Sequence, residues 1–299
     1  MKSYSCYLKR DNVSKGIKLF LKGLLLFLSI GTLASLKSLI FQQNRLGFYP
    51  LEFFHTIKIT VVNFFSLGDG LVFIGHMYVS VFTYLPEAYS YSMIILFSAL
   101  LLGVILAFVF IYFYLWLPLR LKKWVRHLIS ILETLPDVLI IMVFQFGVIY
   151  LYKKTGIKFL QIYSLNTEVY IMPIICLMLV PLFMLIRIMI TLFEEEYEKV
   201  YVDFARAKGL SQLEVFSKHV VRNILYSFTQ YLSIIYWVMI TSLILIEYLF
   251  LIKGFTLLLY RFISPEVFIL AVGLILLPYG LIMLIVKLIS RNIGVPKHE

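Results

Sequence analysis

Four ionisable residues lie within or at the edge of long apolar runs: Glu133, Asp137, Arg187 and Glu247. A charged side chain at the middle of a membrane helix costs roughly 2.5–3.5 kcal/mol unless it is paired or hydrated. Each such residue therefore either has a structural partner or faces a path for a transported solute. We expect structural partners in most cases, and Glu247 and Arg187 are the candidates for a translocation path.

A second feature is the polar stretch 201–223, YVDFARAKGLSQLEVFSKHVVRN. The residues before Gly209 favour helix, and Gly209 offers the left-handed conformation that ends one. Ser211, followed three positions later by Glu214, predicts a capping box at the start of another helix. The stretch is therefore expected to form a helix, a sharp turn and a short second helix.

The first of these helices is expected over about 194–208 and the second over about 212–219. In the second, Leu213 and Phe216 fall on one side at helical spacing. These apolar side chains would suit docking against a partner. The alternative is that the short helix lies on the membrane surface with its apolar side among the lipid headgroups.

The composition is that of an integral membrane protein. Hydrophobic residues make up 62% of the 299 residues and charged residues only 14%, whereas soluble proteins carry roughly 25% charged residues. A net charge of +11 would suggest nucleic acid for a soluble protein. Here the basic residues cluster between apolar runs, as in cytoplasmic loops, so no nucleic acid partner is expected. Cys6 and Cys176 lie too far apart to suggest a disulfide framework.

The apolar runs predict an all-α protein with about six transmembrane helices, since about 20 residues span the hydrocarbon core. The expected spans are 17–40, 91–117, 128–152, 169–193, 224–252 and 267–289.

The basic residues predict how these spans are oriented. One alternating set of connecting segments holds 17 lysines and arginines and the other holds 7. By the positive-inside rule, both termini and the stretch 201–223 then lie in the cytoplasm. The external segment 41–90 is too small for a core of its own, so a re-entrant or amphipathic element is expected there.

The stretch 201–223 resembles the cytoplasmic loop of binding-protein-dependent ABC importer permeases, and especially that of the dipeptide/oligopeptide branch. The loop of that branch reads approximately Y-V-R-T-A-R-A-K-G-L and then H-x-x-R-N. In the general family form E-A-A-x-x-x-G, Asp203 stands for the Glu and Gly209 for the Gly. Phe204 and Ala205 stand for the two alanines.

The resemblance runs from about residue 64 to 289. SLGDG and YLPEAYS resemble the segment before the second span, and ETLPDVL resembles a turn on the cytoplasmic side. IEYLFLIKGF matches E-x-x-F-x-x-x-G with Glu247 and Gly254. The sequence departs from the family pattern at Phe204, at Lys253 and around Tyr226.

The resemblance implies the type I ABC importer permease fold and a short coupling helix that sits in a cleft of a separate ATPase subunit. Asp203 and Ala205 would brace the first loop helix, and Leu213 and Phe216 would anchor the second. The implied partners are cytoplasmic ABC ATPase subunits, a second permease that is either identical or a paralogue, an extracellular substrate-binding protein and the lipid bilayer. A bacterial cell membrane is the expected location.

The resemblance also predicts an organisation along the chain. Residues 1–90 would hold an N-terminal tail, the first span and the external segment. Residues 91–293 would form the permease domain, with its coupling loop at 194–222. Residues 294–299 would form a cytoplasmic tail.

An enzymatic function is not expected. The sequence has no G-x-x-x-x-G-K-[ST], so ATP would be hydrolysed by a partner, and it has no H-E-x-x-H or other metal-binding spacing. No cofactor and no metal are therefore expected. Two alternatives to a peptide importer stay open: an importer of a non-peptide solute such as a metal chelate or an amino acid, and a stand-alone secondary transporter. The latter typically shows matching repeats with broken helices, and the chain shows none.

Overall fold

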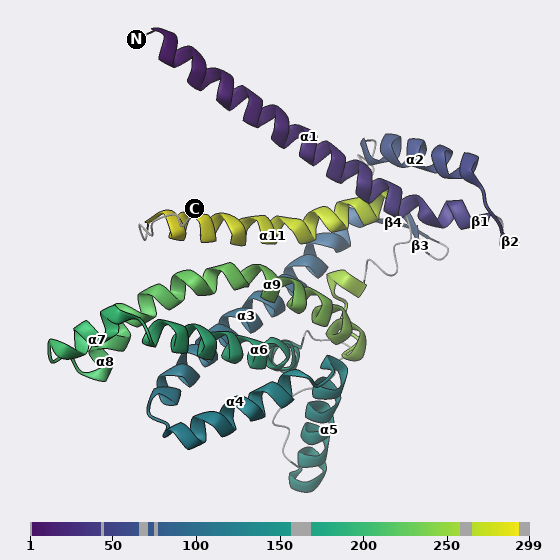
Figure 1. Cartoon of the computed structure of the whole chain (residues 1–299). Helices are drawn as coiled ribbons and strands as arrows, with labels where there is room; N and C mark the ends of the chain where they lie inside the picture. Colours follow the sequence, from purple (N-terminus) through teal and green to yellow (C-terminus); the bar gives the residue numbers. More distant parts are fainter. Residues whose placement is uncertain are drawn as a thin grey trace. The chain divides into compact units, whose positions relative to one another are not determined.

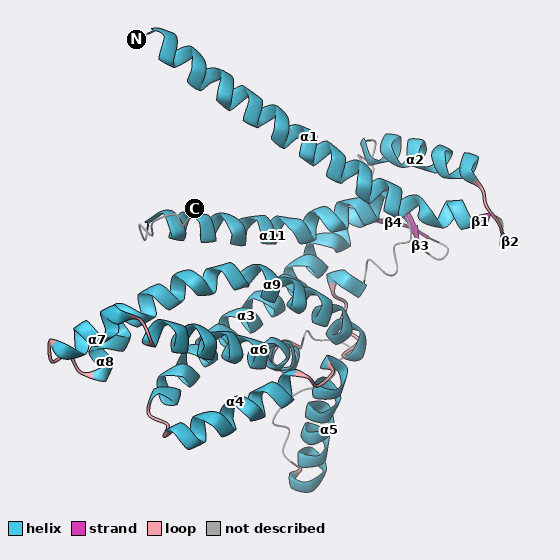
Figure 2. Ribbon diagram, in the orientation of Figure 1, coloured by secondary structure: helices cyan, strands magenta, loops and turns pink. Residues whose placement is uncertain are grey.

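The computed structural model describes residues 2–42, 45–65, 71–74, 77–156, 169–257 and 265–292. The described part is almost entirely helical (Figure 2). In chain order the elements are α1 (Lys2–Ile40), β1 (Phe41–Gln42), β2 (Arg45–Leu46), α2 (Pro50–Phe65), β3 (Leu71–Ile74), β4 (Met77–Ser80), α3 (Val81–Leu115), α4 (Leu119–Glu133), α5 (Asp137–Thr155), α6 (Ile171–Tyr197), α7 (Val200–Ala207), α8 (Gln212–Val215), the π-helical turn η2 (Phe216–Val220), α9 (Val221–Leu249) and α11 (Pro265–Asn292).

Six helices of the described residues are long and apolar enough to cross a membrane, which confirms the predicted fold class. The spanning segments are Leu21–Ile40, Leu85–Leu115, Asp137–Thr155, Ile171–Tyr197, Val221–Leu249 and Pro265–Leu288.

The third span begins later than predicted. The expected run 128–152 is divided, because α4 ends at Glu133 and α5 begins at Asp137, with Pro136 as its N-cap residue. Proline restricts the preceding residue to extended conformations and provides a favourable helix start. Glu133 and Asp137 therefore lie on either side of a break between two helices, Glu133 at the end of α4 and Asp137 at the first position of the third span.

The chain divides into two compact units, residues 1–84 with 259–277 and residues 85–258 with 278–299. In the first unit, α2 packs along α1, with the rings of Phe27 and Phe64 5.0 Å apart. The Asn63 amide donates to Glu266 at the start of α11 over 3.1 Å. The helix α2 is the short element expected in the external segment, while SLGDG lies outside the described residues.

In the second unit, α6 and α9 lie side by side and form the centre of the packing (Figure 1). Both are apolar along their length, and α6 buries most of its residues from Met172 to Phe193. The helices α4 and α5 pack against α6. This pair of long helices carries the polar stretch at one end, where α7 and α8 connect α6 to α9 (Figure 1).

The helices of the polar stretch differ from the prediction in two ways. The first is not continuous from 194, because α6 ends at Tyr197 and α7 starts only at Val200. The second does not end near His219: after the single turn of α8, the chain passes through the π-helical turn η2 directly into α9. The short helix is thus the beginning of a spanning helix.

Candidate functional site

The turn between α7 and α8 is fixed by its own backbone. Gly209 adopts a φ of 82°, the left-handed conformation predicted for it. Its N–H donates to the Arg206 carbonyl over 2.8 Å, and the Leu210 N–H donates to the Ala205 carbonyl over 3.3 Å. These two bonds form a Schellman motif, which satisfies the last carbonyl groups of α7.

The start of α8 is capped as predicted. The Glu214 N–H donates to Ser211 Oγ over 3.3 Å, and the Ser211 N–H donates back to Glu214 Oε2 over 3.0 Å. Such a reciprocal pair stabilises a helix start by roughly 0.5–2 kcal/mol. The cap sets the direction in which the chain enters α8.

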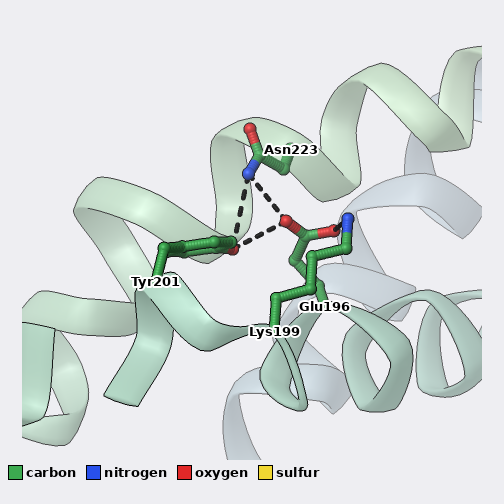
Figure 3. A network of polar contacts seen from close by, with 4 residues as sticks. All are labelled: Glu196, Lys199, Tyr201 and Asn223. Carbon is green, nitrogen blue, oxygen red and sulfur yellow. Dashed lines mark hydrogen bonds and ion pairs between the residues drawn. The ribbon is translucent and has the colours of Figure 1, made fainter. Parts of the chain in front are cut away.

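Behind this turn lies a buried carboxylate that joins three helices (Figure 3). Glu196, in the last turn of α6, is only 4% exposed. Its carboxylate accepts hydrogen bonds from Lys199 Nζ at 2.5 Å, from Tyr201 OH in α7 at 2.7 Å and from Asn223 Nδ2 in α9 at 2.7 Å. The arrangement fixes the beginning of α7 and of α9 to the end of α6.

One donor of this network, the Tyr201 phenol, stays protonated. Burial, together with the hydrogen bond to Glu196, raises the pKa of the Tyr201 phenol above its ordinary value, so the phenol keeps its proton. The Asn223 amide also lies 3.4 Å from the Tyr201 oxygen. The hydrogen bond from the Tyr201 phenol to Glu196 is therefore kept at physiological pH.

The inner side of the polar stretch is packed against the rest of the chain. Val202 and Val215 have no exposed surface, and Ala205 is buried, while its bracing role stays a prediction. Phe216 is also buried, and its ring lies 6.0 Å from that of Phe193 in α6. The expectation that Phe216 anchors an outside partner is therefore corrected: its contact is with its own chain.

Asp203 does not brace the loop either. Its side chain is 73% exposed, and within the described part of the chain its ion-pair partner is Arg206, one turn along the same helix, at 3.6 Å. An exposed pair of this kind contributes little to stability. In the structure, the side chain that connects α7 to α6 and α9 is Glu196, through its hydrogen bonds with Tyr201 and Asn223.

The outer side of the polar stretch carries exposed apolar side chains. Val200 and Phe204 are 69% and 66% exposed, and Leu213 is 38% exposed. We call these three residues the outer surface of the loop. The deviation from the family pattern at Phe204 thus adds an aromatic ring to this surface.

Two ion pairs hold α4 to α6. Arg187 pairs with Glu133 over 2.8 Å, and Glu194 pairs with Arg126 over 2.8 Å. Glu194 also accepts from Tyr114 OH in α3 over 2.8 Å. Arg187 therefore has a structural partner, and its contribution to a translocation path stays a prediction.

Glu247 is completely enclosed near the end of α9. Its carboxyl group accepts from Ser92 Oγ at 2.5 Å, from Thr256 Oγ1 at 2.6 Å and from the Leu257 N–H at 2.9 Å. A Cβ at Gly254 would overlap this group. Glu247 thus closes the segment after α9 onto α3, and a role in solute passage stays a prediction.

The remaining residue of the first group is Asp137, which accepts a hydrogen bond from Ser242 Oγ of α9 over 2.7 Å. All four ionisable residues at the edges of apolar runs thus have protein partners, as expected. No group of three or more potential metal ligands occurs among the described residues.

The geometry described so far is a pair of long helices joined by a capped, braced and outwardly apolar loop. A family model for the inner membrane component of binding-protein-dependent transport systems matches residues 99–294. This match covers more than half of the chain. The chain belongs to that family.

No curated protein sequence matches the chain. The family match extends over the loop, both ion pairs that hold α4 to α6, and Glu247. It includes five of the six spanning segments wholly or in part. The inner membrane component therefore has the type I ABC importer permease fold, and the function implied by that fold is transport.

Gly209 gives a first prediction for this permease. A Cβ there would meet no atom within 4 Å, so the cost of a side chain is conformational and not steric. Val at a positive φ costs about 1–2 kcal/mol, whereas Asn tolerates it. Gly209→Val should open the turn, seen as faster hydrogen exchange across α7 and α8, and Gly209→Asn should change exchange little. Equal exchange in both variants would contradict the assignment.

The network around Glu196 is the part of the site that the sequence reasoning missed. Glu196 and Asn223 are 27 residues apart in the sequence, and only the fold brings them together. One signal was present. Three consecutive glutamates, Glu194 to Glu196, end an otherwise apolar helix, and a helix of period 3.6 must turn at least one of them inward.

Proposed function

We propose that this permease subunit forms the translocation path for a peptide-like solute that an external binding protein delivers. Transport is driven by a separate cytoplasmic ABC ATPase, which docks on the loop that contains α7 and α8. A second permease, identical or paralogous, completes the path. The membrane is the bacterial cell membrane, with both termini in the cytoplasm.

The observation that carries this proposal is the two-sided construction of the loop. Its inner side is held by Glu196 and by buried apolar residues, while its outer surface exposes Val200, Phe204 and Leu213. Exposed apolar side chains that are grouped on a rigid support typically mark an interaction site. Interfaces typically derive most of their energy from a few such apolar anchors.

The test exchanges one anchor for a charge. Phe204→Asp should leave the permease inserted in the membrane, because the Phe204 side chain is mostly exposed. Co-purification of the ATPase encoded with this permease should fall by about thirtyfold or more, since an anchor contributes roughly 2 kcal/mol. Substrate-stimulated ATP hydrolysis in reconstituted membranes should fall in parallel.

Phe48→Asp is the matched control. Phe48 is 76% exposed in the segment expected outside the cell, so the same substitution there should leave ATPase binding unchanged. Undiminished binding in Phe204→Asp would remove the main support for a docking loop. Because the ATPase is cytoplasmic, its capture through α7 and α8 also tests the orientation inferred from the basic residues.

Support for a peptide-like solute comes from the resemblance of the stretch 201–223 to the dipeptide/oligopeptide branch. Uptake of labelled di- and oligopeptides by cells that carry the complete system, compared with uptake of amino acids and metal chelates, distinguishes the alternatives. Uptake limited to either of the latter would exclude the peptide assignment and leave the ATPase-coupled mechanism in place.

A further inference from the structure

The helix α4 has three differently occupied sides. One side packs on α6 through Ile129, which is buried, and through the ion pairs of Arg126 and Glu133. A second side exposes apolar residues, and a third exposes cations. This is the pattern of a helix at a membrane boundary, attached to its own protein on the remaining side.

The cations are concentrated at the beginning of the helix: Arg120, Lys122, Lys123 and Arg126. Lys122 lies over the ring of Tyr114, 5.1 Å from its centroid, and Arg126 pairs with Glu194. Arg120 and Lys123 are exposed, and neither has an ion-pair or hydrogen-bond partner among the residues that the structure describes. Two cations are thus available to an external anion.

The exposed apolar residues follow directly along the same helix. Trp124, Leu128 and Ile131 are 73%, 56% and 49% exposed and lie at i, i+4 and i+7, which places them in one strip. At 100° per residue this strip adjoins Arg120 and Lys123 on the helix surface. Along this strip Arg120 and Lys123 precede Trp124, and Leu128 and Ile131 follow it, while Leu119 and Leu121 are also exposed at the start of the helix.

The ion pairs place this order relative to the membrane. Arg126, nearer the start of α4, pairs with Glu194 in the last turn of α6, whereas Glu133, at the end of α4, pairs with Arg187 deeper in that span. The two helices therefore run in opposite directions. Taking the end of the spanning helix α6 as the membrane boundary, this antiparallel arrangement puts the cations of α4 near that boundary and its last turns deeper along α6.

We propose that α4 binds an anionic phospholipid of this leaflet, with the phosphate at Arg120 and Lys123 and an acyl chain along Trp124, Leu128 and Ile131. Charge complementarity favours a lipid over a protein partner, because lysine is depleted from the cores of protein interfaces while basic residues at a membrane surface attract anionic lipids. The inference requires only that the chain spans a membrane, so it is independent of ATPase docking.

The test uses the full chain in vesicles of phosphatidylcholine and phosphatidylglycerol. A photoactivatable phosphatidylglycerol analogue should label residues 119–133 several times more strongly than the corresponding phosphatidylcholine analogue. Because each cation contributes roughly a factor of five to the attraction, the double variant Arg120→Gln with Lys123→Gln should reduce this labelling by about tenfold or more. Exchange of the two cations, Arg120→Lys with Lys123→Arg, should preserve it.

Lys153→Gln with Lys154→Gln is the control, since it removes the same charge from two exposed lysines at the far end of α5. It should leave the labelling of α4 unchanged. Equal labelling by both analogues, or unchanged labelling in the Gln double variant of α4, would overturn the proposal. The proposal would also be overturned if a photocrosslinker introduced at Leu128 joined α4 to a second permease and not to lipid.

Discussion

Glu196→Ala should leave the permease in the membrane but uncouple it from the ATPase. The substitution removes the carboxylate that accepts from the Asn223 amide and the Tyr201 phenol, two partly buried donors. Each such loss costs about 1–3 kcal/mol. The pair with Lys199 adds little, because that lysine is 56% exposed. A total of about 2–4 kcal/mol is enough to release α7 from α6 and α9 without unfolding the spans.

The measurement is hydrogen exchange across residues 197–223, together with ATPase binding and substrate-stimulated hydrolysis. Exchange should accelerate by about thirtyfold or more, as expected for a local loss of 2 kcal/mol. Glu195→Ala is the matched control, because Glu195 is the exposed neighbour in the same turn. If both variants behaved alike, Glu196 would not organise the loop.

Glu247→Leu should be the most destabilising single change in the second unit. Leucine retains the bulk of the side chain but leaves Ser92, Thr256 and the Leu257 N–H without an acceptor in a site with no exposed surface. The expected cost is about 3–5 kcal/mol. Glu247→Gln still offers one acceptor oxygen, so it should cost roughly half as much.

Thermal stability in detergent, followed by the loss of monodisperse protein, is the readout for this series. Glu87→Leu is a suitable control, since Glu87 is exposed in α3 and its replacement should not lower the transition temperature. A Glu247→Leu variant as stable as the wild type would show that the three hydrogen bonds do not hold this segment. Transport assays on the Gln variant then test separately whether the carboxyl group takes part in passage.

Local sequence chemistry was sufficient to predict the turn of the loop. Gly209, Ser211 and Glu214 act through bonds to neighbours within a few residues, so their geometry depends little on the rest of the fold. The number of spans was equally accessible, because it depends on the length and polarity of each run. These features were confirmed without adjustment.

The errors share a physical cause, which is that hydropathy and helical periodicity ignore tertiary position. Hydropathy treated 128–152 as one span, although the resemblance had indicated a turn at ETLPDVL, which is where the structure separates α4 from α5. Helical spacing put Phe216 on the same side as Leu213, and the resemblance implied that both residues anchor a partner. The π-helical turn η2 begins at Phe216, and the ring packs on Phe193 inside the protein.

That turn also determines what kind of motion α9 can receive. A π-helical turn contains about one residue more than the α-helical turn it replaces, which corresponds to roughly 100° of helical phase. The elements α8, η2 and α9 form one continuous helix. The extra residue in η2 rotates the side-chain directions of α9 relative to those of α8. A movement of α8 would then reach α9 through continuous helical backbone, with no loop between them to absorb it.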